Sequence, residues 1–196
     1  LAIQPDLGSQ PGLWEMGLFD CRRDGNYQLC FTWLTLVRLD ADGENMMTDA
    51  VTSNDLVEGF REVGLKPGDV VLAHSAMRTF GPIDGGADAV IDALLEVIGP
   101  RGTLVVPTFT FAHEAEDDPI IDPASDRSEM GIITETARKR PDALRSTAFR
   151  HSFAAIGRRA TVITNIDPAL TVFDFRSSFG VMLSLNTHVL LLGVTY

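Results

Sequence analysis

Polar side chains that can do acid–base or binding chemistry follow two short runs of this sequence. His74 and Ser75 come directly after the apolar run Val70–Ala73. The stretch Thr108–Thr110, which carries two hydroxyl groups, follows the run Thr103–Val106. An imidazole exchanges a proton near neutral pH, and hydroxyls with backbone N–H groups can hold an anion or a developing oxyanion. Both groups are candidates for a binding site, and the alternative is that their hydroxyls only cap local structure.

A further candidate is His151, which stands between Arg150 and Ser152 at the start of the run Ser152–Ile156. The neighbouring cation favours the neutral imidazole, which is the form that a general base requires. A lone histidine is more often structural than catalytic. The sequence by itself therefore leaves both roles open for His151.

Acidic residues are concentrated in the polar segment His113–Glu129. Loops of this length inside a compact domain are usually functional or disordered. Converging carboxylates would hold a polyamine, whereas the alternative is a solvated acidic loop. The acidic residues of the segment are Glu114, Glu116, Asp117, Asp118, Asp122, Asp126 and Glu129.

The composition argues against several other classes of protein. The chain has 196 residues, 45% of them hydrophobic, which is enough for one domain with a substantial core. A formal net charge of -11 argues against a nucleic-acid partner and is compatible with a cationic substrate. The two cysteines, Cys21 and Cys30, form neither a disulfide framework nor a CxxC metal motif, so we expect no metal site. No apolar run approaches the roughly 20 residues of a membrane span, so we expect a cytoplasmic protein with no membrane partner.

The elements that must position these side chains are strands and helices in alternation. Val70–Ala73 and Thr103–Val106 are typical of strands covered on both faces, as in a parallel sheet flanked by helices. Between them, apolar residues recur at helical spacing up to Ile98, before the stop signal Gly99-Pro100. A right-handed parallel crossover follows, and ligands of such sheets collect at the carboxyl ends of the strands. The alternative is an ordinary connection that binds nothing.

Helical and strand patterns continue on both sides of this unit. Ser53 or Asn54 can cap a helix that ends at Gly64, and Ser128 can cap a helix through Lys139 with Ile132, Ile133 and Thr136 facing inward. We expect further elements at Ser152–Ile156, Ala160–Ile166, Phe179–Asn186 and Val189–Val194. Residues 1–45 read differently, and Met46-Met47 resembles an internal translation start. We therefore expect an N-terminal extension at 1–45, disordered or from a misplaced start, and a domain at 46–196.

Several motifs in one order resemble a known family. They are LVEGFREVGLKPGDVVLAHSAMRTFG, DGGADAVIDALLEVIGPRGTLVVPTFTF, SEMGIITETARKRP, LRS followed by HSFAAIG, and VLLLGV. Together, over about residues 53–196, they resemble the aminoglycoside 3-N-acetyltransferase family. The resemblance implies an α/β fold, a layered sandwich with a largely parallel central sheet flanked by helices. This fold is unrelated to the common GNAT acetyltransferases, whose pyrophosphate signature is absent here.

The resemblance assigns roles to individual residues. It implies that His151 is the catalytic base and that acetyl-CoA is the co-substrate. The implied substrate is a small cationic amine, and from the acidic segment we expect Asp122 and Glu129 to bind it. The residues implied to bind CoA are His74, Ser75, Ala76, Arg78, Thr108, Thr110, Arg145 and Ser146.

The sequence departs from the family pattern at three places. Ala76 replaces a second serine of the family's His-Ser-Ser-Leu-Arg loop, and Ala148–Arg150 replaces His-Pro-Thr. The family's Asn-Thr-Ser-x-His-x-x-Glu stretch would follow Val194, so we expect a domain truncated at its C-terminus. The implied function is direct acetyl transfer from acetyl-CoA to the 3-amino group of an aminoglycoside antibiotic. The alternative is a CoA-binding homologue, or an inactive fragment, without antibiotic acetylation.

Overall fold

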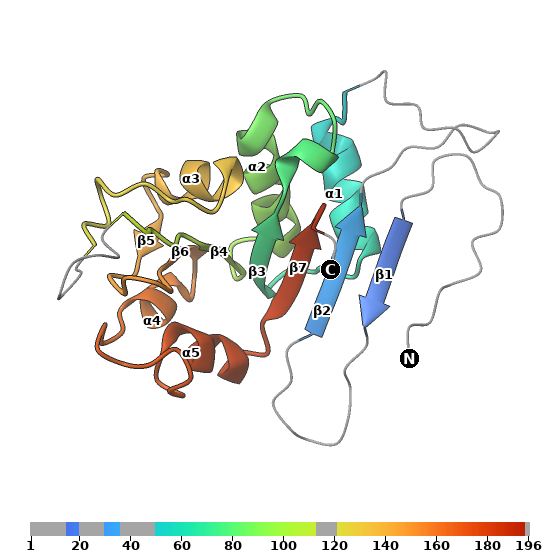
Figure 1. Cartoon of the computed structure of the whole chain (residues 1–196). Helices are drawn as coiled ribbons and strands as arrows, with labels where there is room; N and C mark the ends of the chain where they lie inside the picture. Colours follow the sequence, from blue (N-terminus) through green and yellow to red (C-terminus); the bar gives the residue numbers. More distant parts are fainter. Residues whose placement is uncertain (1–14, 20–29, 36–49, 113–120, 195–196) are drawn as a thin grey trace.

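The computed structural model describes the backbone of two short strands at residues 15–19 and 30–35, and residues 50–112 and 121–194 in full. These residues form a seven-stranded sheet in the order β1-β2-β7-β3-β4-β6-β5 (Figure 1). The strands are β1 (Glu15–Phe19), β2 (Cys30–Thr35), β3 (Val70–Ser75), β4 (Thr103–Pro107), β5 (Leu144–Arg145), β6 (Phe153–Gly157) and β7 (His188–Leu192).

The centre of the sheet is parallel and its two ends are antiparallel. Strands β2, β7, β3 and β4 run parallel to one another, whereas β1 is antiparallel to β2, β6 to β4, and β5 to β6. The helices are α1 (Ser53–Glu62), α2 (Gly86–Ile98), α3 (Ile132–Arg138), α4 (Ala160–Thr164) and α5 (Ser178–Ser184), with one 3-10 turn, η1 (Met77–Thr79).

Helices cover both faces of the sheet, which confirms the expected layered α/β sandwich. Along β3, Val71 and Ala73 pack into the cluster that holds α1, α2 and α3, whereas Val70 and Leu72 pack into the cluster that holds α4 and α5. Figure 1 shows these two groups of helices on opposite sides of the strands. Successive side chains of a strand point to opposite faces, so a strand covered twice must be apolar at every position.

Helix α1 begins with a capping box at Thr52. The Thr52 hydroxyl accepts a hydrogen bond from the N–H of Asp55, and the Asp55 carboxylate accepts one from the N–H of Thr52. The expectation that Ser53 or Asn54 is the cap is therefore wrong by one or two residues. Thr52 and Asp55 stand three apart, which is the spacing that reciprocal capping requires.

Helix α3 begins later than expected, at Ile132, and its N-cap is Gly131. Ser128 is not its cap, because its hydroxyl bonds to the Thr134 hydroxyl and accepts the N–H of Met130. Ile133 is buried, but Ile132 faces outward and is 56% exposed, which corrects its assignment to the inner face. The hydroxyl of Ser128 is used inside the turn rather than at the helix end.

The close packing of β4 against β6 depends on a glycine. Gly157 has a φ of +120°, and a Cβ at this position would overlap the carbonyl oxygen of Gly102. Only glycine combines that backbone conformation with such an approach. A larger residue at this position would disturb the pairing of β6 with β4, in which Gly157 lies opposite Thr103.

Strands β1 and β2 come from the part of the chain that was expected to be an extension. β2 pairs in parallel with β7 from Cys30 to Leu34, and β1 pairs with β2. The division at residue 45 stays a prediction, and its test is given in the Discussion. Among the residues that the structure describes, no helix is both long and apolar enough to cross a membrane.

Candidate functional site

The sheet topology brings the predicted residues to one edge of the sheet, the edge formed by the carboxyl ends of its central parallel strands. β3 and β4 end there, and because β6 runs antiparallel to β4, it begins at the same edge with His151 and Ser152 just before it. The N–H of Thr108 donates to the carbonyl of Ser152, and the N–H of Ser146 donates to the carbonyl of Phe153. β5 therefore ends at this edge as well.

Arg145 is the centre of a hydrogen-bond network at this edge. Its Nη2 atom donates to the carbonyl of Thr108 at 2.6 Å and to the Thr110 hydroxyl at 2.8 Å, and its Nε atom donates to the Thr108 hydroxyl at 3.1 Å. Its Nη1 atom donates to the carbonyl of Asp126. Burial, and then the Arg138 cation, lowers the pKa of Arg145. Arg145 thus ties the strand end to the loop that contains Asp126.

The hydroxyls nearby bond to protein atoms as well. The Ser152 hydroxyl donates to the carbonyl of Thr108 at 2.8 Å, and the Ser146 hydroxyl accepts the N–H of Phe153 at 3.0 Å. Thr108, Ser146 and Ser152 are all buried. These hydroxyls therefore order the strand ends, whatever else they contact.

A second set of contacts holds the loop 121–129 from the other side. Glu135 and Arg138 form a buried ion pair with two hydrogen bonds, of 2.6 and 2.9 Å. Arg138 also donates to the carbonyl of Ala124, and Glu135 accepts the N–H of Ser128 at 2.8 Å. Burial alone would raise the pKa of Glu135, but the hydrogen bonds from Arg138, Lys139 and Ser128 outweigh it and lower the pKa to about 2.

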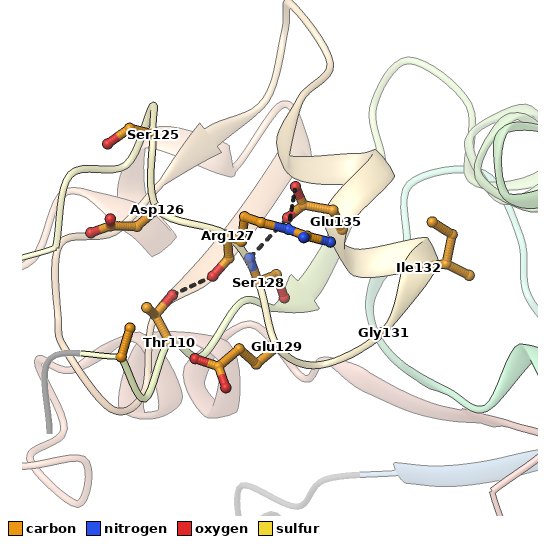
Figure 2. A pocket seen from close by; sticks show the side chains of 10 residues that line it. Thr110, Ser125, Asp126, Arg127, Ser128, Glu129, Gly131, Ile132 and Glu135 are labelled. Carbon is orange, nitrogen blue, oxygen red and sulfur yellow. Dashed lines mark hydrogen bonds and ion pairs between the residues drawn. The ribbon is translucent and has the colours of Figure 1, made fainter.

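The loop and α3 line an open pocket of about 750 Å³. Figure 2 shows Asp126 and Glu129 on the loop, with Thr110 bonded to the carbonyl of Arg127 on one side and Glu135 on the other. Glu129 lines the pocket and also accepts the N–H of Phe111 at 2.7 Å. Acidic side chains thus line a cavity large enough for a small polar ligand.

His151 lies in a separate, smaller pocket of about 280 Å³, between the start of β6 and α5. Its imidazole meets the ring of Phe109 edge-to-face, with 5.3 Å between ring centroids, and that of Phe179 at 6.4 Å. The outer side of His151 is exposed. Burial of its inner side, and secondarily the Arg150 cation, lowers the pKa of His151, which favours the neutral ring. The expected direction of the Arg150 effect is confirmed, although burial is the larger cause.

The loop after β3 carries the remaining predicted CoA ligands. His74 and Ser75 are half-buried at the end of β3, and burial lowers the pKa of His74. Arg78, in η1, is exposed and makes no hydrogen bond or ion pair within the described residues. Gly193 packs against this loop so closely that a Cβ there would overlap the Thr79 hydroxyl.

The structure brings most of the predicted site residues to one edge, but not all into one cavity. Asp122 does not line the described pockets, because its carboxylate accepts the N–H of Ala124 and the Ser125 hydroxyl within its own turn. These bonds, Ser125 first, lower its pKa. The remaining acidic residues of the predicted segment, Glu114, Glu116, Asp117 and Asp118, lie outside the described residues.

Sequence reasoning missed four residues that build the site. Phe109 and Phe179 contact His151, and Glu135 with Arg138 fixes the acidic loop. The three-residue spacing of Glu135 and Arg138 in a helix was a usable signal, because such pairs face each other. The aromatic contacts gave no signal, since the residues are far apart in the chain. Among the described residues, no cluster of three potential metal ligands occurs.

A comparison with protein-family models decides the assignment, because residues 72–196 match the family described as Aminoglycoside 3-N-acetyltransferase. The chain belongs to that family. Aminoglycoside N(3)-acetyltransferase VII of Streptomyces paromomycinus is 34% identical over 162 residues, which cover 73% of this chain and 56% of that protein. Aminoglycoside N(3)-acetyltransferase IV of Salmonella sp is 32% identical over 140 residues, 71% of this chain and 52% of that protein.

Solved structures show the same fold. The apoenzyme of aminoglycoside acetyltransferase AAC(3)-IVa has a TM-score of 0.68 and 31% identity, over 76% of this chain and 57% of that one. The YokD protein from Bacillus subtilis has a TM-score of 0.68 and 28% identity, over 76% and 63%. The chain thus spans little more than half the length of the curated relatives described above.

Proposed function

We propose that the protein is an acetyl-CoA-dependent N-acetyltransferase that acts on the 3-amino group of aminoglycoside antibiotics, with His151 as general base. Solved structures of AAC(3)-IVa contain apramycin or a gentamicin, in both cases with one histidine replaced by alanine. AAC-IIIb, whose fold matches at a TM-score of 0.64 and 24% identity, was solved with CoASH. A cytoplasmic location accompanies this proposal, because acetyl-CoA is an intracellular metabolite.

The single observation that carries the proposal is the state of His151. The histidine lies at the edge where β3, β4, β5 and β6 present their polar residues, and its pKa is lowered. It makes no hydrogen bond or ion pair within the described residues, so its ring nitrogens are available to a substrate. A base must be neutral and within reach of the proton it removes.

The reaction needs few groups beyond this base. The amine nitrogen attacks the thioester carbonyl carbon, the new C–N bond forms, and His151 takes the proton that the amine loses. When the C–S bond breaks, the CoA thiolate leaves and is protonated. Backbone N–H groups at the strand ends can stabilise the oxyanion that forms between these steps. No covalent enzyme intermediate is required.

The charged side chains of the site favour binding of a cationic amine at one place and of an anionic co-substrate at another. Glu129 and Asp126 line the larger pocket, which suits an aminoglycoside. Arg78 is an exposed cation close to the end of β3 that bonds to none of the described residues, which suits CoA phosphates. Arg145, by contrast, uses its donors on protein atoms. We therefore propose that Arg78 contacts CoA directly and that Arg145 acts by ordering Thr108 and Thr110.

Replacement of His151 by asparagine tests the proposal. Acetylation of apramycin should fall by about 10²- to 10⁴-fold, the usual contribution of a general base. CoA binding by isothermal titration calorimetry should be unchanged. In the parent protein, rates should fall only as the pH drops below the ordinary histidine pKa of 6.5, because the His151 pKa is lowered. A His151→Asn protein that acetylates at the parent rate overturns this function.

The alternative is a homologue that binds CoA without transfer. The departures at Ala76 and at Ala148–Arg150 favour it, because they remove groups that the family pattern supplies there. Calorimetry separates the two functions. CoA binding that weakens with salt, without acetylation of any aminoglycoside, supports the alternative. Arg78→Ala should weaken CoA binding, whereas Arg158→Ala, a change at another exposed arginine, serves as the control.

A further inference from the structure

Four aromatic rings, that of His151 among them, form a closed cycle of edge-to-face contacts. Phe109 contacts His151 at 5.3 Å and Phe153 at 5.7 Å, between ring centroids. Phe179 contacts His151 at 6.4 Å and Phe153 at 5.0 Å. The interplanar angles lie between 65° and 87°. Each ring of the cycle therefore meets two others in the geometry that aromatic quadrupoles prefer.

The rings come from elements that are themselves fixed. Phe153 lies in β6 and is fully buried. Phe109 follows β4, and its carbonyl accepts the N–H of Glu129. Phe179 lies in the first turn of α5, which the Ser177 hydroxyl caps through the N–H of Gly180. The imidazole is consequently held between two supports from different parts of the chain.

Among the residues that the structure describes, no carboxylate lines the pocket of this imidazole. The residues that line the His151 pocket are apolar or hydroxyl-bearing, apart from Arg150, the one charged side chain among those described there. In many enzymes one ring nitrogen of the histidine donates to a carboxylate or carbonyl, which fixes the ring. The ring contacts are the interactions of this imidazole that the described residues provide.

We propose that Phe109 and Phe179 are positioning residues for the imidazole of His151. They hold the plane of the ring by edge contacts and keep its inner side away from water. This inference rests on the proposed role of His151 as the base. A base must be aimed within about 10–20° of its productive direction, and rigid packing is one way to achieve this.

Proton NMR of the His151 side chain tests the geometry directly. Ring currents of the neighbouring phenylalanines should shift the imidazole resonances of His151 in the parent protein. These resonances are assigned by their absence from the spectrum of His151→Asn. Phe109→Leu and Phe179→Leu should move these resonances by several tenths of a ppm, while thermal melts show that both proteins are folded. Phe173→Leu, which changes an almost fully exposed ring that makes no contact with His151, is the control.

Titration separates ring orientation from burial. Arg150 is the charged neighbour, and it stays in place in every variant. The leucine variants should keep the His151 pKa below 6.5, because leucine still excludes water. Phe179→Ala should raise the pKa toward 6.5, because burial is the main cause of the lowered value.

Kinetics then connect the ring geometry to the reaction. Phe179→Leu should lower kcat by about 10- to 100-fold, the size of effect expected from a small misplacement of a catalytic group, with little change in the KM for acetyl-CoA. Phe179→Tyr should restore most of kcat. Unmoved His151 resonances in both leucine variants overturn the positioning role, whatever their activity. Full activity in His151→Asn overturns the general-base function instead, and the NMR results then still report the geometry.

Discussion

Arg145 uses its hydrogen-bond donors on protein atoms at the candidate site. Its guanidinium joins the end of β4 to the loop 121–129 through Thr108, Thr110 and the carbonyl of Asp126. A planar fork can satisfy several acceptors at once, whereas an ammonium group cannot reproduce that geometry. The family resemblance placed Arg145 in the CoA site, and the structure gives its donors protein partners.

Arg145→Lys should therefore destabilise the protein. We expect the free energy of unfolding to fall by about 1–3 kcal/mol, because the carbonyl of Asp126 loses the Arg145 donor and the carbonyl of Thr108 keeps only the Ser152 hydroxyl. Urea unfolding measures this loss. Arg101→Lys, at an exposed arginine, is the matched control and should change little. Equal stability of the two variants would contradict the role given to Arg145.

Glu135 should make the free energy of unfolding depend on pH in the acidic range. Its pKa is about 2 in the folded protein, against an ordinary value of 4.5. A lowered folded-state pKa gives stability that is present above pH 4.5 and is lost as the pH falls toward 2. Urea midpoints measured from about pH 6 to about pH 2.5 should fall more steeply in the parent than in Glu135→Gln. Parallel pH curves for the two proteins would show that Glu135 does not carry this dependence.

At the scale of elements, α1 offers a test of a single hydrogen-bonded cap. Thr52→Ala removes the acceptor of the Asp55 N–H and should lower the free energy of unfolding by about 1 kcal/mol. Ser53→Ala, one residue later, should have little effect, because Ser53 is not the cap. Chemical denaturation of the two variants compares them. A larger loss in Ser53→Ala would return the cap to the residue that the sequence pattern favoured.

Elements with strong local signals were predictable and the others were not. The strand expected at Val70–Ala73 is observed as β3, and the helix expected to end at Ile98 is α2, because both patterns are apolar over several residues and end at clear stop signals. The two-residue strand β5 has too few residues for any pattern. The antiparallel pairing of β6 with β4, and the close approach of Gly157 to Gly102, join residues far apart in the chain, which no local pattern encodes.

The candidate site was predictable only where the family motifs fall. His151, Thr108 and Thr110 were found because they follow strands or match motif positions. Their partners were not found, because Phe109 lies far from His151 in the sequence and Phe179 contacts it from a different element. Asp122 shows a different limit of the sequence. Its charge suggested that it binds the substrate, but its carboxylate bonds to residues of its own turn.

For the whole molecule, whether residues 1–45 belong to the domain can be measured. Residues from Leu56 onward form a core cluster on each face of the sheet, so a chain that begins at Met47 should keep a cooperative thermal melt. The same truncation removes β2 and leaves the edge of β7 unpaired, which favours association between copies. Circular dichroism should show the melt, and light scattering after gel filtration should show larger species. Loss of the cooperative melt would show that residues 1–45 belong to the domain.

The loop 121–129 is fixed before any ligand arrives, because buried or half-buried donors hold the carbonyls of Ala124, Asp126 and Arg127. A ligand that binds Glu129 or Asp126 therefore does not have to order this loop, and it avoids the entropic penalty that flexible loops impose on binding. Calorimetry of apramycin at several temperatures should show a small loss of entropy for the parent protein. Arg138→Met, which releases one of the three carbonyls, should make the binding entropy less favourable. Fixed loops also resist proteases, so the same variant should be cut faster by trypsin after Arg127.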